Sequence, residues 1–133
     1  MKFMLMMHAP RTASGEYQVS GWSPDDFKAH IEFMHQLNRG LTDAGEFVGA
    51  QGLAAPGAAR IVRAGKGGVP AVTDGPYPES KEFLAGFWIV EVETPERAYA
   101  IAGEASAAPG PGGKPLNMPI EVRQVMCAPP VDQ

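Results

Sequence analysis

The sequence predicts a single α+β domain that spans residues 1–133. Two observations support this fold class. The predicted elements follow the order strand, helix, strand, then a pair of strands, then strand, helix, strand. The hydrophobic fraction of 44% in 133 residues is enough to build one buried core. This order is the ferredoxin-like, or split βαβ, pattern with an extra β-hairpin.

The strands are predicted from short runs that are apolar or rich in β-branched and aromatic residues. They lie at residues 2–8, 47–51, 59–64, 70–73, 83–93 and 120–126. The third and fourth strands are joined by the turn-forming segment Gly65-Lys66-Gly67-Gly68 and therefore form the hairpin. Residues 9–22 are predicted to be a loop, and loops of that length in compact domains are often functional.

Two helices are predicted from the same start signal, a capping hydroxyl followed by proline and a carboxylate. Ser23-Pro24-Asp25-Asp26 begins a helix that we expect to end near residue 44, before Gly45. Thr94-Pro95-Glu96 begins a second helix that extends to about residue 107. The proline- and glycine-rich residues 108–113 are not expected to form regular structure.

The strands carry apolar residues on both faces, which predicts a homodimer. Alternation places the residues of the first strand and the long strand in two sets each. In the first strand, Phe3, Leu5 and Met7 lie on one face and Met4 and Met6 on the other. In the long strand, Trp88, Val90 and Val92 lie on one face and Ala85, Phe87 and Ile89 on the other. Two helices cover only one face, and a bare apolar face is rare on soluble monomers. We therefore expect a second copy to pack sheet against sheet; a loop folded over that face is the alternative.

Composition excludes several classes of protein. The net charge of −4 without a basic block argues against nucleic-acid binding. No stretch approaches the roughly 20 apolar residues of a membrane helix, and the apolar residues 1–7 are too short for a signal peptide. Cys127 is the only cysteine, so no internal disulfide forms, and we expect a cytoplasmic protein.

The sequence predicts neither a metal site nor a cofactor. His30 and His35 are five residues apart, which separates them by about 140° on a helix and prevents them from sharing one ion. Gly65-Lys66-Gly67-Gly68 lacks the Lys-Ser/Thr and the helix that follow in a phosphate loop. Cys127 lies near the terminus with no neighbouring base in sequence, so it is not expected to act as a nucleophile.

Two histidines are candidates for a site. His30 falls within the apolar arc of the first helix, and Asn38 lies near its edge. The apolar members of this arc are Phe27, Ile31, Met34, Leu37, Leu41 and Ala44. A histidine facing the core either makes a structural hydrogen bond or points into a pocket between helix and sheet. His8 ends the first strand beside the long loop, whereas His35 lies off the arc and is expected to be solvated.

The segment at residues 72–82 joins two predicted strands and combines four ionisable residues with a tyrosine. Asp74 occupies its tight turn, where a carboxylate often bonds nearby backbone amides. The residue is therefore either a turn former or a functional acid or base.

Three runs in and after this segment carry a family resemblance. Thr73-Asp74-Gly75-Pro76-Tyr77, Glu79-Ser80-Lys81-Glu82 and Gly86-Phe87-Trp88-Ile89 closely resemble the DGPF motif of the YCII-related proteins, with tyrosine in place of the motif's phenylalanine. The resemblance implies ferredoxin-like chains paired in a dimeric α/β barrel. Some members of the DGPF branch are linked to alternative sigma factors. The wider group includes a dehalogenating lyase-type enzyme, and a His–Asp pair has been proposed as catalytic in the YCII branch. Met34 stands at the position that we align with this histidine, one turn after His30.

Two functions are consistent with these features. The first is a small-molecule enzyme or binder with lyase- or hydrolase-type acid/base chemistry and a pocket between the first helix and the sheet. Its candidate catalytic residues are Asp74, His30 and His8, and its candidate residues for a small organic ligand are Tyr77, Lys81 and Trp88. The second is a non-enzymatic accessory or regulatory dimer linked to an alternative sigma factor system.

Overall fold

Four antiparallel strands form the central sheet in a computed structural model that describes residues 1–10, 21–75 and 81–126. The strands are β1 (Lys2–Pro10), β2 (Phe47–Gly52), β5 (Glu82–Glu91) and β6 (Ile120–Gln124), in the spatial order β2-β5-β1-β6. This order and the mixed α+β composition are compatible with the predicted ferredoxin-like pattern. The predicted strand ranges are correct to within two residues at each end.

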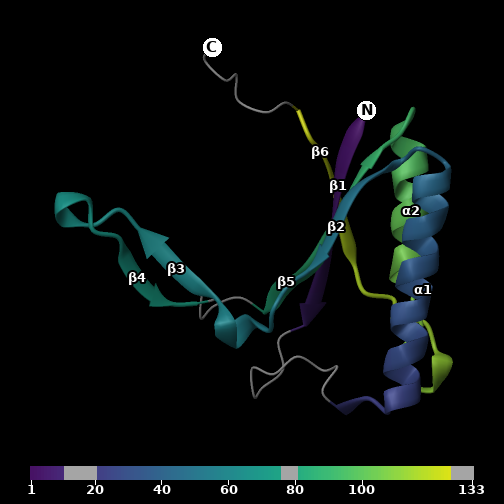
Figure 1. Cartoon of the computed structure of the whole chain (residues 1–133), viewed down its shortest axis with the longest axis horizontal. Helices are drawn as coiled ribbons and strands as arrows, with labels where there is room; N and C mark the ends of the chain where they lie inside the picture. The colour runs from purple at the N-terminus through teal and green to yellow at the C-terminus, as the bar shows by residue number, and fades with distance from the viewer. Residues whose placement is uncertain (11–20, 76–80, 127–133) are drawn as a thin grey trace.

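Two helices lie on the same side of this sheet (Figure 1). They are α1 (Pro24–Asp43) and α2 (Pro95–Ser106). The Ser23 hydroxyl accepts a hydrogen bond from the amide of Asp26 at 3.1 Å, and Thr94 caps α2 in the same way. Gly45 follows the α1 cap with a φ of 73°, a left-handed conformation that favours glycine. Both predicted helix starts and the end of α1 are therefore confirmed.

The predicted hairpin forms a separate two-stranded sheet of β3 (Arg60–Arg63) and β4 (Ala71–Asp74). It projects away from the central sheet on the side opposite the helices (Figure 1). The 3₁₀ turn Lys66–Gly68 lies between its strands. Residues 108–113 form neither an α-helix nor a strand, as expected; Pro111–Gly113 make a short 3₁₀ turn in which Gly112 has a left-handed φ of 69°.

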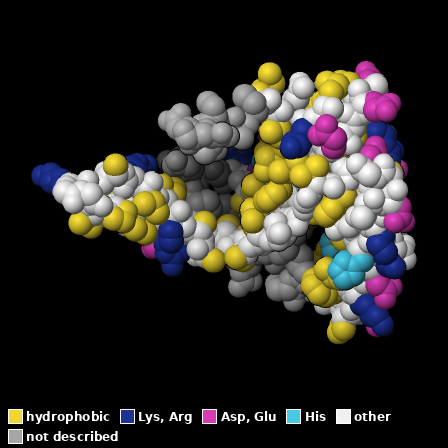
Figure 2. Space-filling view, turned by 45° about the horizontal axis from the view of Figure 1, so that its top comes forward, with side chains coloured by type: hydrophobic (Ala, Val, Ile, Leu, Met, Phe, Trp, Pro, Cys, Tyr) yellow, Lys and Arg dark blue, Asp and Glu magenta, His cyan; other side chains and the backbone are white. Residues whose placement is uncertain are grey.

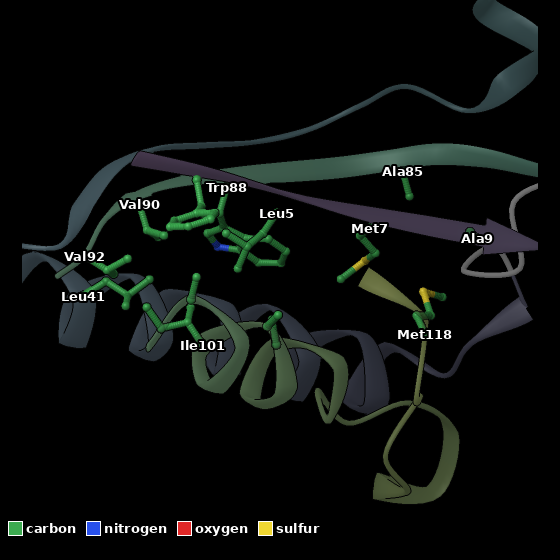
Figure 3. Close-up of a cluster of buried hydrophobic side chains, with 14 of the residues drawn as sticks. Leu5, Met7, Ala9, Leu41, Ala85, Trp88, Val90, Val92, Ile101 and Met118 are labelled. Carbon is green, nitrogen blue, oxygen red and sulfur yellow. The ribbon is translucent and has the colours of Figure 1, made fainter. Parts of the chain in front are cut away.

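The hydrophobic core lies between the sheet and the two helices. Leu5, Val90 and Ile101 are its largest fully buried side chains, and they come from β1, β5 and α2 respectively. Figure 3 shows Leu5, Trp88, Val90 and Leu41 pointing into the space between the strands and the helices. The core therefore joins the elements of both halves of the chain.

A bulge in β5 corrects one prediction about which residues share a face. Met7 pairs with Gly86 and His8 pairs with Leu84, so Ala85 has no partner on β1. The extra residue shifts the alternation, and Ala85 joins Trp88 in the core instead of lying on the opposite face with Phe87. A Cβ atom on Gly86 would lie 2.8 Å from the carbonyl oxygen of Gln51, so glycine is required where β2 and β5 approach.

The other side of the central sheet carries apolar residues that no described helix covers (Figure 1). Met4 pairs with Ile89 and Met6 pairs with Phe87, and all four side chains are half-buried. We call this set of four residues the open face. The prediction of apolar residues on both faces of β1 is confirmed. Among the described residues, neither helix combines the length and apolar character needed to cross a membrane.

Candidate functional site

A pocket of about 330 Å³ lies between α1 and the strands β2 and β5. Residues from α1 form one wall and residues from the sheet form the other. Members of the two walls are Phe27, His30, Ile31, Met34 and Asn38 from α1, and Met7, Ala50, Gln51, Ala85 and Trp88 from the sheet. We call it the α1 pocket. It occupies the position between the first helix and the sheet where the sequence predicts a ligand site.

His30 lies in the wall of this pocket and is half-buried. Its Nδ1 lies 3.0 Å from the carbonyl oxygen of Pro109, and because a carbonyl only accepts, Nδ1 must carry the hydrogen. The ring of Trp22 packs edge-on against the imidazole, with 5.3 Å between the ring centroids. The placement of His30 on the inner arc of α1 is confirmed. It makes a structural hydrogen bond and lines a pocket at the same time.

Asn38 lies two turns after His30 on the same helix and bonds the sheet directly. Its Oδ1 accepts a hydrogen bond of 2.9 Å from the indole Nε1 of Trp88. An indole N–H is only a donor, so this contact fixes the orientation of the Asn38 amide. Position on the edge of the apolar arc was the sequence signal for Asn38, but its partner could be identified only from the fold.

The polar groups that line the pocket from side chains are His30, Asn38, Gln51 and the indole of Trp88. No Asp, Glu, Lys or Arg of the described chain is part of the lining. The rest of the surface is apolar, which is typical of pockets that hold small organic molecules.

His8 lies on the other face of the sheet from His30. It follows Met4 and Met6 in the alternation of β1, and its Nε2 lies 3.1 Å from a carboxylate oxygen of Glu121 on β6. Arg123 approaches the same carboxylate at 3.9 Å. The sheet therefore separates the two candidate histidines, and one active site within a single chain cannot use both.

Asp74 ends β4 in the hairpin, and its side chain is 96% exposed. Its carboxylate lies 3.5 Å from the Nε of Arg60 on β3. The residue does not line the α1 pocket, so one chain does not bring Asp74 and His30 together. Lys81 is exposed, whereas Trp88 is buried against α1. Tyr77 and Cys127 lie outside the described residues, as does most of the predicted loop at residues 9–22.

One ion pair outside the pocket has a clear electrostatic signature. The guanidinium of Arg97 donates two hydrogen bonds of 2.8 Å to Glu46, and this hydrogen bonding lowers the pKa of the Glu46 carboxyl. Glu46 precedes β2 and Arg97 lies in the first turn of α2, so the pair joins two distant parts of the chain. We assign it a structural role. In the part of the chain that is described, no group of three or more His, Cys, Asp or Glu residues is arranged to hold a metal ion.

Together, the fold and the pocket define an α+β protein with a mainly apolar pocket between a helix and an antiparallel sheet. The family model of the YCII-related domain matches residues 1–110, and the chain belongs to the YCII-related family. A comparison with curated proteins finds no match.

Proposed function

We propose that the chain binds a small organic molecule in the α1 pocket and uses His30 as the acid–base group there. One observation carries this proposal. His30 is fixed by its bond to the Pro109 carbonyl while it lines an otherwise mainly apolar cavity. A histidine that is positioned but not enclosed is a typical general acid or base.

The chemistry of this site is of the lyase or hydrolase type. In neutral His30 the Nδ1 hydrogen is committed to Pro109, which leaves Nε2 as the proton acceptor. Asp74 and His8 cannot assist within the same chain, because one is in the exposed hairpin and the other is on the opposite face of the sheet. A role for Asp74 in this chemistry requires a second copy of the chain.

Calorimetric titration with a panel of single-ring organic compounds tests the binding function. A Met34→Trp variant should fill the pocket and abolish the binding seen with wild type, while circular dichroism verifies that the fold is retained. Val62→Ser in the hairpin is the control and should bind as wild type does. Binding that survives in the Met34→Trp variant would place the ligand elsewhere.

We further propose that the protein is a homodimer in which the open faces of two copies pack together, giving a dimeric α/β barrel. Support comes from the four apolar side chains of the open face, which neither described helix covers. Ile89→Glu should convert the dimer to a monomer in sedimentation experiments. Tyr99→Glu on exposed α2 surface should leave the dimer intact. A monomeric wild type at micromolar concentration would contradict the proposal.

The second candidate function is that of an accessory dimer linked to an alternative sigma factor system. The projecting hairpin favours it, because Val62, Val69 and Val72 are all more than half exposed there. Figure 2 shows hydrophobic side chains gathered along this projection. If the hairpin binds a sigma factor, Val62→Ser and Val72→Ser together should weaken binding to the purified factor, whereas Met34→Trp should not.

We also assign the chain to the DGPF branch of the family and to the cytoplasm. The branch assignment is supported by Thr73-Asp74-Gly75-Pro76-Tyr77, and the location by the single cysteine at position 127.

A further inference from the structure

We propose that the α1 pocket selects an uncharged, elongated ligand that has a hydrogen-bond donor at one end and an acceptor at the other. This inference rests on the proposed function and adds the chemical class of the ligand. It follows from three properties of the described residues, namely two fixed polar groups, the distance between them, and the absence of charge in the lining.

The first fixed group is the Nε2 of His30. Because Nδ1 donates to the Pro109 carbonyl, the neutral imidazole presents a lone pair at Nε2. Among the described residues Nε2 has no hydrogen-bond partner. The ligand must therefore bring a donor, such as a hydroxyl, to this end of the pocket.

The second fixed group is the amide nitrogen of Asn38. Its Oδ1 is occupied by the indole N–H of Trp88, so the two hydrogens on Nδ2 remain. No described residue accepts from them, and Asn38 lines the pocket. The ligand should therefore bring an acceptor, such as a carbonyl oxygen, to this second end.

The spacing of these groups sets the length of the ligand. His30 and Asn38 are eight residues apart on α1, which separates their Cα atoms by about 12 Å along the helix axis. Met34 lies midway between them and presents an apolar side chain to the same pocket. Because side chains of a helix lean toward its N-terminus, we expect a similar spacing between the Nε2 of His30 and the Nδ2 of Asn38. A single ring with substituents at opposite positions, together with two hydrogen bonds of about 2.8 Å, spans a comparable length.

The absence of charge sets the ionic state of the ligand. With no Asp, Glu, Lys or Arg in the described lining, a carboxylate or an ammonium group would lose its hydration without gaining an ionic partner. We therefore expect 4-hydroxyacetophenone to bind, since its hydroxyl donates and its ketone oxygen accepts. The anion 4-hydroxybenzoate should bind at least ten-fold more weakly.

Calorimetric titration of the full chain tests the inference with 4-hydroxyacetophenone, phenol and acetophenone. The compound with both groups should bind about ten-fold more tightly than either compound with one. Asn38→Asp keeps the acceptor for Trp88 but removes the free donor. It should weaken binding of 4-hydroxyacetophenone about ten-fold relative to binding of phenol, because phenol has no acceptor that needs the lost donor. His30→Phe should remove the advantage of 4-hydroxyacetophenone over acetophenone, which keeps the test valid if Asn38→Asp does not fold.

The outcomes separate this inference from the proposed function. If all three ring compounds bind equally, and Met34→Trp abolishes this binding, the α1 pocket is a ligand site but the donor–acceptor selection is wrong. Tighter binding of 4-hydroxybenzoate than of 4-hydroxyacetophenone would also overturn the inference. If no compound of the series binds, or if binding is the same in wild type and the Met34→Trp variant, the proposed function fails and the inference fails with it.

Discussion

The central sheet and the β3–β4 hairpin are made of similar residues, yet their side chains lie in different environments. In β1 every second side chain from Phe3 to Ala9 is buried, and Leu5 has no exposed surface. In the hairpin Val72 is 56% exposed, and no residue of β3 or β4 is buried. A two-stranded ribbon alone is marginal in water, whereas a sheet packed on helices is not. Strand-forming residues are therefore sufficient to specify a ribbon, whereas the stability of the central sheet comes from the helices that cover it.

The largest expected effect is the loss of a core side chain from the sheet. Leu5→Ala should lower the free energy of unfolding by about 2–5 kcal/mol, because it removes buried methyl groups and leaves a cavity. Urea denaturation measures this change. Val72→Ala removes a similar apolar group from the hairpin and is the control. A comparable loss in both variants would contradict the comparison.

The next largest effect concerns the close approach of β2 and β5. Gly86→Ala should lower the free energy of unfolding by about 1–3 kcal/mol, since the new methyl group would overlap the carbonyl of Gln51. Gly103→Ala is a matched control in α2, where the new methyl group would meet no atom within 4 Å beyond the adjacent residues and the backbone of its own helix. It should be neutral or stabilising, because alanine favours a helix. Equal thermal stability of the two variants would show that the sheet adjusts freely at Gly86.

A smaller effect should appear at acidic pH through the Glu46–Arg97 pair. The pKa of the Glu46 carboxyl is lower in the folded chain than its unfolded value of 4.5. The ion pair with Arg97 therefore contributes its full stabilisation of the fold above that pH. This contribution is lost as the pH falls through the lowered pKa, because protonation removes the charge. Glu46 is 15% exposed and Arg97 is 42% exposed, so Glu46→Gln should cost no more than about 1 kcal/mol at neutral pH.

The pH dependence of unfolding checks the sign of this prediction. Between neutral pH and the acid range, wild type should lose more stability than Glu46→Gln, and the two should converge at the acid end. A constant difference at every pH would mean that the effect of the substitution is steric.

The smallest effect is expected in the hairpin. Val72→Thr should change the free energy of unfolding by less than about 0.5 kcal/mol, because the side chain already faces water. Hydrogen exchange gives an independent measurement. The β3–β4 amides should exchange well before those between β1 and β5, and equal protection of the two sheets would indicate that a partner molecule covers the hairpin.

Local signals in the sequence were sufficient to predict the helices and strands and the face of α1 that lies toward the sheet. Ser23, Thr94 and Gly45 mark helix ends through contacts within a few residues, and such contacts can be recognised without the fold. The face of Ala85 could not be predicted, because the bulge is defined by the pairing of β5 with a distant strand. Likewise, the partner of His30 is a main-chain carbonyl 79 residues away, and no residue type in the sequence indicates it.

The contact between His30 and Pro109 has a consequence for how the family can vary. The bond goes to a main-chain oxygen, so its chemistry does not depend on which side chain occupies position 109. It does depend on the length of the segment that follows α2, where Pro109 pairs with Pro115 around the 3₁₀ turn at Pro111–Gly113. A different side chain at position 109 should therefore be tolerated, whereas Gly112 and Gly113, with left-handed φ values of 69° and 76°, should resist substitution. A single inserted or deleted residue would displace the carbonyl and release the hydrogen that it holds on the imidazole.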